Sequence, residues 1–122
     1  MKEKGAHVRV GTVGERIAER YLRSLGYSII GRNVKLPIGE LDLVAKDGHE
    51  FVFVEVKTMS GTGFGYPEQH VDRRKQRKLR QLAELTMRAY GQDQLYRIDV
   101  IAVTIGSTNE PLIHHIKHAV EG

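Results

Sequence analysis

The segment of residues 39–58, GELDLVAKDGHEFVFVEVKT, constrains the fold of this chain more than any other segment. Apolar and polar residues alternate on both sides of an Asp-Gly pair, a pattern that is typical of a β-hairpin with a two-residue turn. We therefore expect strands at residues 40–46 and 50–58, joined at this pair.

The register of the hairpin decides which residues share a face of the sheet. With the Asp-Gly pair as the turn, Glu40 lies opposite Glu55, and Asp42 is a diagonal neighbour of Glu55 at about 7–8 Å between backbones. Opposed residues project from the same side, so these carboxylates share one face with Lys57. An odd-length loop would separate Asp42 from Glu55. The other face is apolar and is expected to be buried; it consists of Leu41, Leu43, Ala45, Val52, Val54 and Val56.

The gathered charges have the chemistry of a metal site that acts on phosphate. Asp42 and Glu55 present carboxylate oxygens, hard ligands that suit Mg²⁺ or Mn²⁺. Lys57 points into the same space, where its ammonium would orient water or stabilise charge on a phosphodiester. Glu40 is a further candidate, as a second metal ligand, a supporting acid or a rim residue. The competing interpretation makes Asp42 and Glu55 exposed edge-strand charges that prevent aggregation.

The remainder of the chain predicts two helices and three further strands. The helices are expected at residues 12–25 and 71–90, each with one apolar stripe and a glycine after its last turn. The stripe of the second helix is expected to contain Leu79, Leu82, Ala83, Thr86 and Tyr90. Strands are expected at residues 27–35, 95–105 and 112–118, and a glycine-rich loop at residues 60–67. The order α-β-β-β-α-β-β predicts an α/β domain built on one mixed sheet.

Length and composition set the outer bounds. A chain of 122 residues fits one domain over residues 1–122. No apolar run approaches the roughly 18 residues of a membrane span, and the N-terminal residues contain no signal-peptide core. The chain has no cysteine, which excludes disulfides and thiolate metal sites. We therefore expect a cytoplasmic protein with no membrane partner.

A block of positive charge follows the glycine-rich loop. The sequence RRKQRKLR, residues 73–80, carries six cations in eight positions and no acid. On a helix, such a block suits a phosphate backbone, an acidic protein surface or a solvated face. Its place beside the candidate phosphodiester site favours nucleic acid, DNA ahead of RNA. The candidate binding residues are Arg73, Arg74, Lys75, Arg77, Lys78 and Arg80. Gln69, Lys75 and Gln76 are further polar candidates in this segment, and spacing alone does not single out one of them.

The histidines near the C-terminus raise the alternative of a zinc site. On a strand, His114 and His118 share a face but stand about 13 Å apart, too far to chelate one ion. We therefore expect His114, His115 and His118 to be surface residues. Asp99, within the apolar run RIDVIAV, is expected to be a strand-edge acid or the partner of a nearby cation.

Asp42 followed by Glu55-Val56-Lys57 resembles the PD-(D/E)xK signature of restriction-endonuclease-like nucleases, with Leu41 in place of the proline. Four longer segments resemble the YraN-type family, a bacterial group usually described as predicted endonucleases. They are GTVGERIAERYLRSLGYSIIGRNVKLPIGELDLVAKDG, FVFVEVKTMS, FGYPEQHVDRRKQRKL and IDVIAV. The chain is also similar to archaeal Holliday junction resolvases, in which an N-terminal helix supplies a further acidic residue.

These resemblances imply a restriction-endonuclease-like three-layer sandwich, with a central mixed β-sheet flanked by helices. They also imply a catalytic set of Glu15, Asp42, Glu55 and Lys57, in which Glu15 matches the acidic residue of the N-terminal helix. Glu15 has a purely structural alternative, because it follows Thr12 by three residues, the spacing of a capping box.

The sequence therefore predicts a nuclease-like protein that uses Mg²⁺ or Mn²⁺ on structured or single-stranded DNA or RNA. One alternative is a non-catalytic nucleic-acid-binding module that keeps the nuclease fold. Another is a scaffold whose basic helix meets an acidic protein. A two-fold homodimer would suit a branched substrate.

Overall fold

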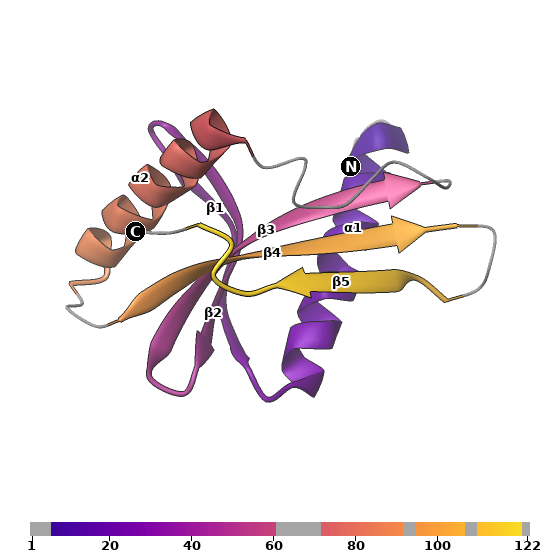
Figure 1. The fold of residues 1–122 in the computed structure, drawn as a ribbon, viewed down its shortest axis with the longest axis horizontal. Coiled ribbons are helices and arrows are strands. Elements are labelled where there is room, and N and C mark those ends of the chain that lie inside the picture. The colour runs from indigo at the N-terminus through magenta and orange to yellow at the C-terminus, as the bar shows by residue number, and fades with distance from the viewer. Residues whose placement is uncertain (1–5, 61–71, 92–94, 107–109, 121–122) are drawn as a thin grey trace, which may run out of the picture.

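The computed structural model describes residues 6–60, 72–91, 95–106 and 110–120, which form two helices and five strands (Figure 1). The predicted order of elements is confirmed. The first helix begins six residues before the predicted start, which places Thr12 inside it. The elements are α1 (Ala6–Ser24), β1 (Ser28–Leu36), β2 (Gly39–Asp47), β3 (Glu50–Ser60), α2 (Arg73–Ala89), β4 (Tyr96–Ile105) and β5 (Leu112–Ile116).

The strands form one mixed sheet in the order β1-β2-β3-β4-β5. All neighbours are antiparallel except β3 and β4, which run parallel. Parallel neighbours need a crossover connection, and α2 lies in the segment that joins them. The predicted α/β architecture on a mixed sheet is therefore confirmed at this level.

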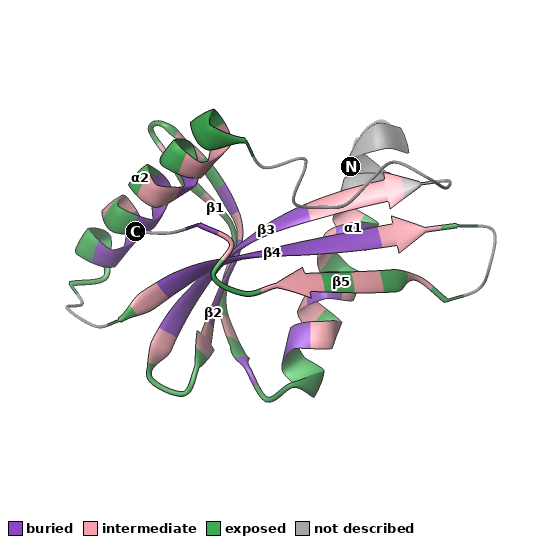
Figure 2. Cartoon of the chain, in the orientation of Figure 1, coloured by how far each residue is buried: buried purple, intermediate pink, exposed green. Residues whose placement is uncertain are grey.

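Two separate cores cover the two faces of the sheet. Adjacent residues on a strand point to opposite faces, so Phe53 enters the core beneath α2 while Val54 enters the core beneath α1. Figure 2 shows the buried residues concentrated in β3, β4 and the inner sides of the helices. The result is three layers, in which α1 and α2 lie on opposite faces of the sheet.

The predicted apolar face is correct except at its first residue. Leu43, together with Ala45, Val52, Val54 and Val56, belongs to the α1-side core. Leu41 is equally buried but belongs to the α2-side core. The pairing of β2 with β3 ends at Leu43 and Val54, so the regular alternation that supported the prediction does not extend to Leu41.

The turn of the β2–β3 hairpin lies one residue later than predicted. Asp47 pairs with Glu50, which leaves Gly48 and His49 as the turn, and Gly48 has φ 68°. The Arg97 guanidinium explains this register, because its Nη1 lies 3.3 Å from Asp47 Oδ2 and 2.9 Å from Glu50 Oε1. Moving the turn by one residue shifts every opposed pair by two positions, so side chains keep their faces. The predicted opposition of Glu40 and Glu55 belongs to the other register and is wrong, because the β2–β3 pairs end at Leu43 and Val54.

Helix α2 has a defined start and end. The Asp72 side chain caps it by accepting a hydrogen bond from the backbone N–H of Lys75 at 2.9 Å. Gly91, with φ 66°, follows its C-cap, as expected from the sequence. Tyr90 was expected on the inner face but is the exposed C-cap, and the buried face consists of Leu79, Leu82, Ala83, Thr86 and Met87.

The last strand is shorter than expected, because the chain leaves it after Ile116 and His118 has φ 53°. Residues 61–67 of the predicted glycine-rich loop and Gln69 lie outside the described residues. Within the described ranges, neither helix combines the length and the apolarity that a membrane span requires.

Candidate functional site

Asp42 lies where β2 separates from β3. Its Oδ2 accepts a hydrogen bond of 2.8 Å from the backbone N–H of Val56, beyond the last paired residues of the two strands. A side chain thus takes the place of a backbone acceptor at this point. The bond holds the carboxylate beside β3, next to Glu55.

The protonation of Asp42 reflects that position. The pKa of Asp42 is raised from 3.8 to about 7; burial is the largest cause and the negative charge of Glu55 the next. The charges of Glu15 and Glu40 raise the pKa further, whereas the hydrogen bond from Val56 opposes the shift. The structure therefore brings Asp42 and Glu55 together as two acids that repel each other at neutral pH.

Glu55 is buried and has a partner from the other helix. Lys75 Nζ lies 3.1 Å from Glu55 Oε2, so an ammonium from α2 neutralises this carboxylate. Lys75 was one of several polar candidates in the sequence, and the structure places it against Glu55. Lys57, two residues after Glu55 on β3, is half-buried, and within the described part of the chain it makes no ion pair.

Glu15 and Glu40 contribute through their electric field more than through contact. Glu15 Oε1 accepts a hydrogen bond of 3.1 Å from Asn33 Nδ2. The capping-box interpretation of Glu15 is wrong, because Thr12 lies inside α1 and not at its start. Glu40 is exposed. Among the described residues, no three Asp, Glu or His side chains converge closely enough to hold a metal ion.

A glycine in α1 sets the distance between this helix and the sheet. A Cβ at Gly14 would lie 3.0 Å from Thr58 Cβ and 3.1 Å from Cγ2, and closer still to Oγ1. The helix can approach β3 this closely only because Gly14 has no side chain. Gly14 precedes Glu15, so the close approach also places Glu15 near Asp42. Gly14 was not predicted from the sequence, although a glycine inside an amphipathic helix was the available signal.

The donor set formed by Asp42 and Glu55 fits a hard divalent cation. Mg²⁺ usually binds one or two carboxylates and keeps several waters or substrate oxygens, so it does not need a third protein acid. Binding would require Asp42 to lose its proton and Glu55 to exchange Lys75 for the metal.

An open groove of about 680 Å³ lies along α2 beside these acids. Lys75 and Glu40 belong both to the groove wall and to the surroundings of the carboxylate pair. Of the predicted cations, Arg73 is exposed outside the groove and Arg80 is half-buried away from it. The groove is lined by Gly39, Glu40, Asp72, Arg74, Lys75, Arg77, Lys78, Gln81 and Leu82.

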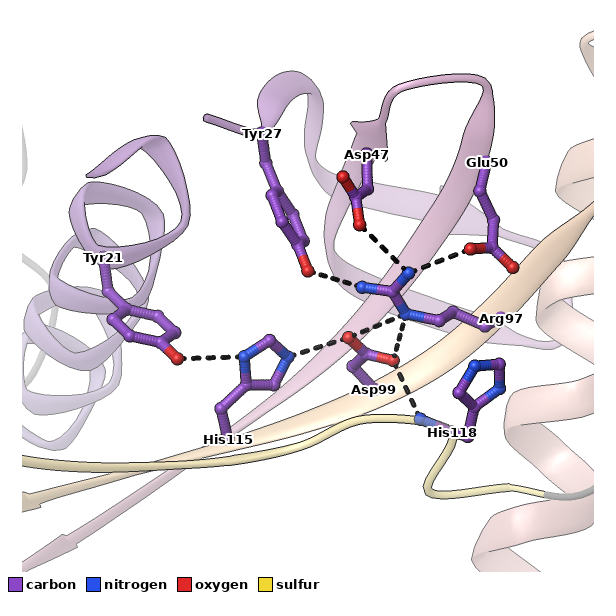
Figure 3. A network of polar contacts seen from close by, with 8 residues as sticks. All are labelled: Tyr21, Tyr27, Asp47, Glu50, Arg97, Asp99, His115 and His118. Carbon is purple, nitrogen blue, oxygen red and sulfur yellow. Dashed lines mark hydrogen bonds and ion pairs between the residues drawn. The ribbon is translucent and has the colours of Figure 1, made fainter. Parts of the chain in front are cut away.

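Figure 3 shows a second charged cluster, which sequence reasoning missed. Arg97 at its centre pairs with Val52 near the start of β3, whereas Glu55 and Lys57 lie further along that strand. The Arg97 guanidinium is buried and contacts Asp99 Oδ1 at 3.0 Å. It also bonds the Tyr27 hydroxyl and the carboxylates of Asp47 and Glu50, which flank the hairpin turn. Burial acts to lower the pKa of Arg97, but the bond to Asp99 and its charge outweigh burial and raise it. The signal was an Arg and an Asp two residues apart in an apolar strand, which places them on one face.

Asp99 and His115 continue this cluster toward α1. Asp99 is fully buried in an inner strand, so the expectation of a strand-edge acid is wrong and that of a partner for a cation is confirmed. Burial opposes ionisation, yet hydrogen bonds from His115, Arg97 and the His118 backbone lower the pKa of Asp99. His115 was expected at the surface, and this expectation is wrong. Its ring lies between Asp99 Oδ2, at 2.8 Å, and the Tyr21 hydroxyl, at 3.0 Å. His114 and His118 are exposed, as expected.

Comparisons with known proteins agree with the family resemblance. A model of the uncharacterised protein family UPF0102 matches residues 14–103. The UPF0102 protein of Caldicellulosiruptor saccharolyticus is 41% identical over 90% of this chain and 95% of its own length. That of Geobacter sulfurreducens is 44% identical over 92% of this chain and 88% of its own length.

Among solved structures, that of Pyrococcus furiosus SfsA in complex with Ca²⁺ is similar, at 16% identity and a TM-score of 0.40. The match covers 94% of this chain, which spans 65% of that protein's length. A likeness at this level defines neither fold nor function.

Proposed function

The chain belongs to UPF0102, the YraN-type family that its sequence resembles, and from this premise we propose a metal-dependent nuclease-like protein that binds and hydrolyses phosphodiesters of DNA or RNA. The observation that carries the proposal is the pair of carboxylates Asp42 and Glu55, held together although their charges repel. The repulsion between the two carboxylates lowers the stability of the fold. A function that uses a cation explains why it is kept.

In the proposed mechanism, Asp42 and Glu55 would hold Mg²⁺ or Mn²⁺; a cation bound there would polarise a phosphate oxygen as a Lewis acid and lower the pKa of a bound water. Lys57, on the same strand as Glu55, orients the attacking water or stabilises negative charge on the phosphodiester. Glu15 and Glu40 add negative potential around the cation.

The basic groove along α2 supports nucleic acid as the ligand. Arg74, Lys75, Arg77 and Lys78 line it, and cations at this density bind phosphate backbones in a salt-dependent manner. The groove reaches the carboxylate pair through Lys75 and Glu40. Backbone phosphates bound there would place a phosphodiester beside the metal ligands, with DNA preferred over RNA.

A second candidate function is a nucleic-acid-binding module without catalysis. The ion pair between Lys75 and Glu55 favours it, because one of the two carboxylates already has a cationic partner from the protein itself. In that case the acids would serve to hold α2 against the sheet, and the groove alone would act.

A cleavage assay separates the two functions. Labelled single-stranded, duplex and four-way DNA, with matching RNA, would be incubated with Mg²⁺, Mn²⁺ or EDTA. We expect metal-dependent cleavage by the unmutated protein and by Glu84→Gln, a control acid that is exposed on α2. Asp42→Asn should abolish cleavage, and Lys57→Ala should reduce it by about 10²–10³-fold while affinity is kept. Binding without cleavage on every substrate would support the non-catalytic module.

A further inference from the structure

A second basic groove, of about 360 Å³, lies between α1 and β1. Only the block on α2 stands out in the sequence, because the cations of α1 are spaced along the helix and the fourth comes from a strand. Its lining residues are Arg16, Glu19, Arg20, Arg23 and Arg32.

One carboxylate organises two of the four guanidiniums. Glu19 Oε2 accepts bonds from Arg23 Nε at 3.1 Å and Nη2 at 3.0 Å. Arg32 bonds the same carboxylate, with Nε 2.8 Å from Oε1 and Nη2 2.6 Å from Oε2. The bond from Arg32 is the largest cause of the lowered pKa of Glu19, so this acid stays ionised. Arg23 and Arg32 are therefore fixed side by side, each with Nη1 outside these bonds.

The charges in the groove do not balance. A single ionised acid faces four guanidiniums, and Arg16 and Arg20 make no ion pair with another described residue. A solvated helix face would explain exposed arginines, but it would not require Glu19 to hold guanidiniums from two different elements together. Guanidinium forks match the geometry of phosphate oxygens, and prior ordering reduces the entropy lost on binding.

The position of the groove relates it to the first one. Helices α1 and α2 cover opposite faces of the sheet, so the two grooves lie on opposite faces as well. Both include residues of the β1–β2 hairpin at the edge of the sheet: Arg32 in this groove, and Gly39 and Glu40 in the other. Glu15 and Asn33 adjoin this groove in sequence and are bonded to each other.

We propose that the α1–β1 groove is a second binding site for a nucleic-acid phosphate backbone, distinct from the α2 groove. A flexible nucleic-acid strand that crosses the β1–β2 hairpin contacts both sites. This inference rests on the proposed function, since it concerns the same polymer. It adds a surface that the carboxylate pair and α2 do not include.

The test uses fluorescence anisotropy with labelled single-stranded DNA of about 30 nucleotides, long enough for two contact regions. Binding constants at several salt concentrations would be compared for the unmutated protein and three double variants. Arg16→Gln/Arg20→Gln removes charge from this groove and Arg74→Gln/Arg77→Gln from the α2 groove. Arg88→Gln/Lys117→Gln removes equal charge at exposed positions outside both. All four proteins should have the same unfolding midpoint, because the substituted side chains are exposed.

We expect Arg16→Gln/Arg20→Gln, the α1 variant, to flatten the slope of log binding constant against log salt concentration by about 1.4, because two phosphate contacts are lost at about 0.7 each for single-stranded DNA. The control variant should leave this slope unchanged. An α1 variant that matches the control while the α2 variant binds more weakly would overturn this inference and leave the proposed function standing. An unmutated protein that binds no nucleic acid would overturn both. Vesicles containing phosphatidylserine provide the last arm: if the α1 variant loses only vesicle binding, the groove serves a lipid surface and the inference is wrong.

Discussion

Lys75 Nζ lies 3.1 Å from Glu55 Oε2, so α2 and β3 are joined by an ion pair inside the candidate metal site. The same ammonium lines the α2 groove. In the proposed mechanism, this ammonium would contact the Glu55 carboxylate when no cation is bound and a backbone phosphate once Glu55 has bound a cation. The exchange would couple metal binding to the groove.

Replacing Lys75 should expose the cost of the buried acid. Lys75→Met leaves Glu55 without its cation, and we expect the free energy of unfolding to fall by about 1 kcal/mol, a modest value because Lys75 is 39% exposed. Mg²⁺ should restore more stability to this variant than to the unmutated protein. Urea denaturation with and without Mg²⁺ measures both effects, with Arg73→Met as the control. Equal responses to Mg²⁺ in all three proteins would show that Lys75 and the metal do not share a site.

Asp42 should make stability depend on pH in a direction opposite to that of most acids. Its pKa in the folded protein, about 7, exceeds the ordinary value of 3.8, so the folded state holds the proton more tightly. Its stabilising contribution is complete below 3.8 and is lost as pH rises toward 7. Asp42→Asn keeps an acceptor for Val56 and removes the repulsion, so it should raise stability at about pH 8 by on the order of 1–2 kcal/mol. Chemical denaturation across pH tests this; lower stability of Asp42→Asn at alkaline pH would contradict it.

The close approach of α1 and β3 should be intolerant of a methyl group. Gly14→Ala places a Cβ against Thr58 and should cost about 1–3 kcal/mol, although alanine normally stabilises a helix. Thr58→Ala removes two of the three clashing atoms, so the double variant should lose less than the sum of the single variants. A double-mutant cycle of unfolding free energies measures this. Additive losses would mean that the helix shifts freely.

The network around Arg97 should be structural and acid-sensitive. Arg97→Leu leaves the buried Asp99 without its guanidinium and should cost about 3–5 kcal/mol. The pKa of Asp99 is lowered, so its contribution is present above the ordinary value of 3.8 and is lost as pH falls through the folded pKa. Thermal unfolding as a function of pH should show this loss of stability at low pH in the unmutated protein and not in Asp99→Asn. Lys117→Leu, at an exposed position, is the control. Equal melting temperatures of Arg97→Leu and Lys117→Leu would refute the structural role of Arg97.

The parts that the sequence predicts are those governed by local pattern. Alternation gave the strands of the hairpin, and Gly91 marked the end of α2, because these depend on neighbouring residues alone. The turn residues and the position of Leu41 were wrong, because Arg97, fifty residues from Asp47, and the end of the β2–β3 pairing determine them. Likewise, the pairing of Lys75 with Glu55 depends on how α2 packs, which no spacing in the sequence contains.

The central claim is that Asp42 and Glu55 together hold a divalent cation, and a Mn²⁺ titration followed by electron paramagnetic resonance tests it most directly. The titration would use the unmutated protein, Asp42→Asn, Glu55→Gln and the control Glu84→Gln, with and without single-stranded DNA. We expect one Mn²⁺ in the unmutated protein and the control, bound about tenfold more weakly at about pH 6 than at about pH 8, because Asp42 must first lose its proton. Neither site variant should bind it. Unchanged binding in Asp42→Asn, or no bound Mn²⁺ in the unmutated protein even with DNA present, would contradict the claim.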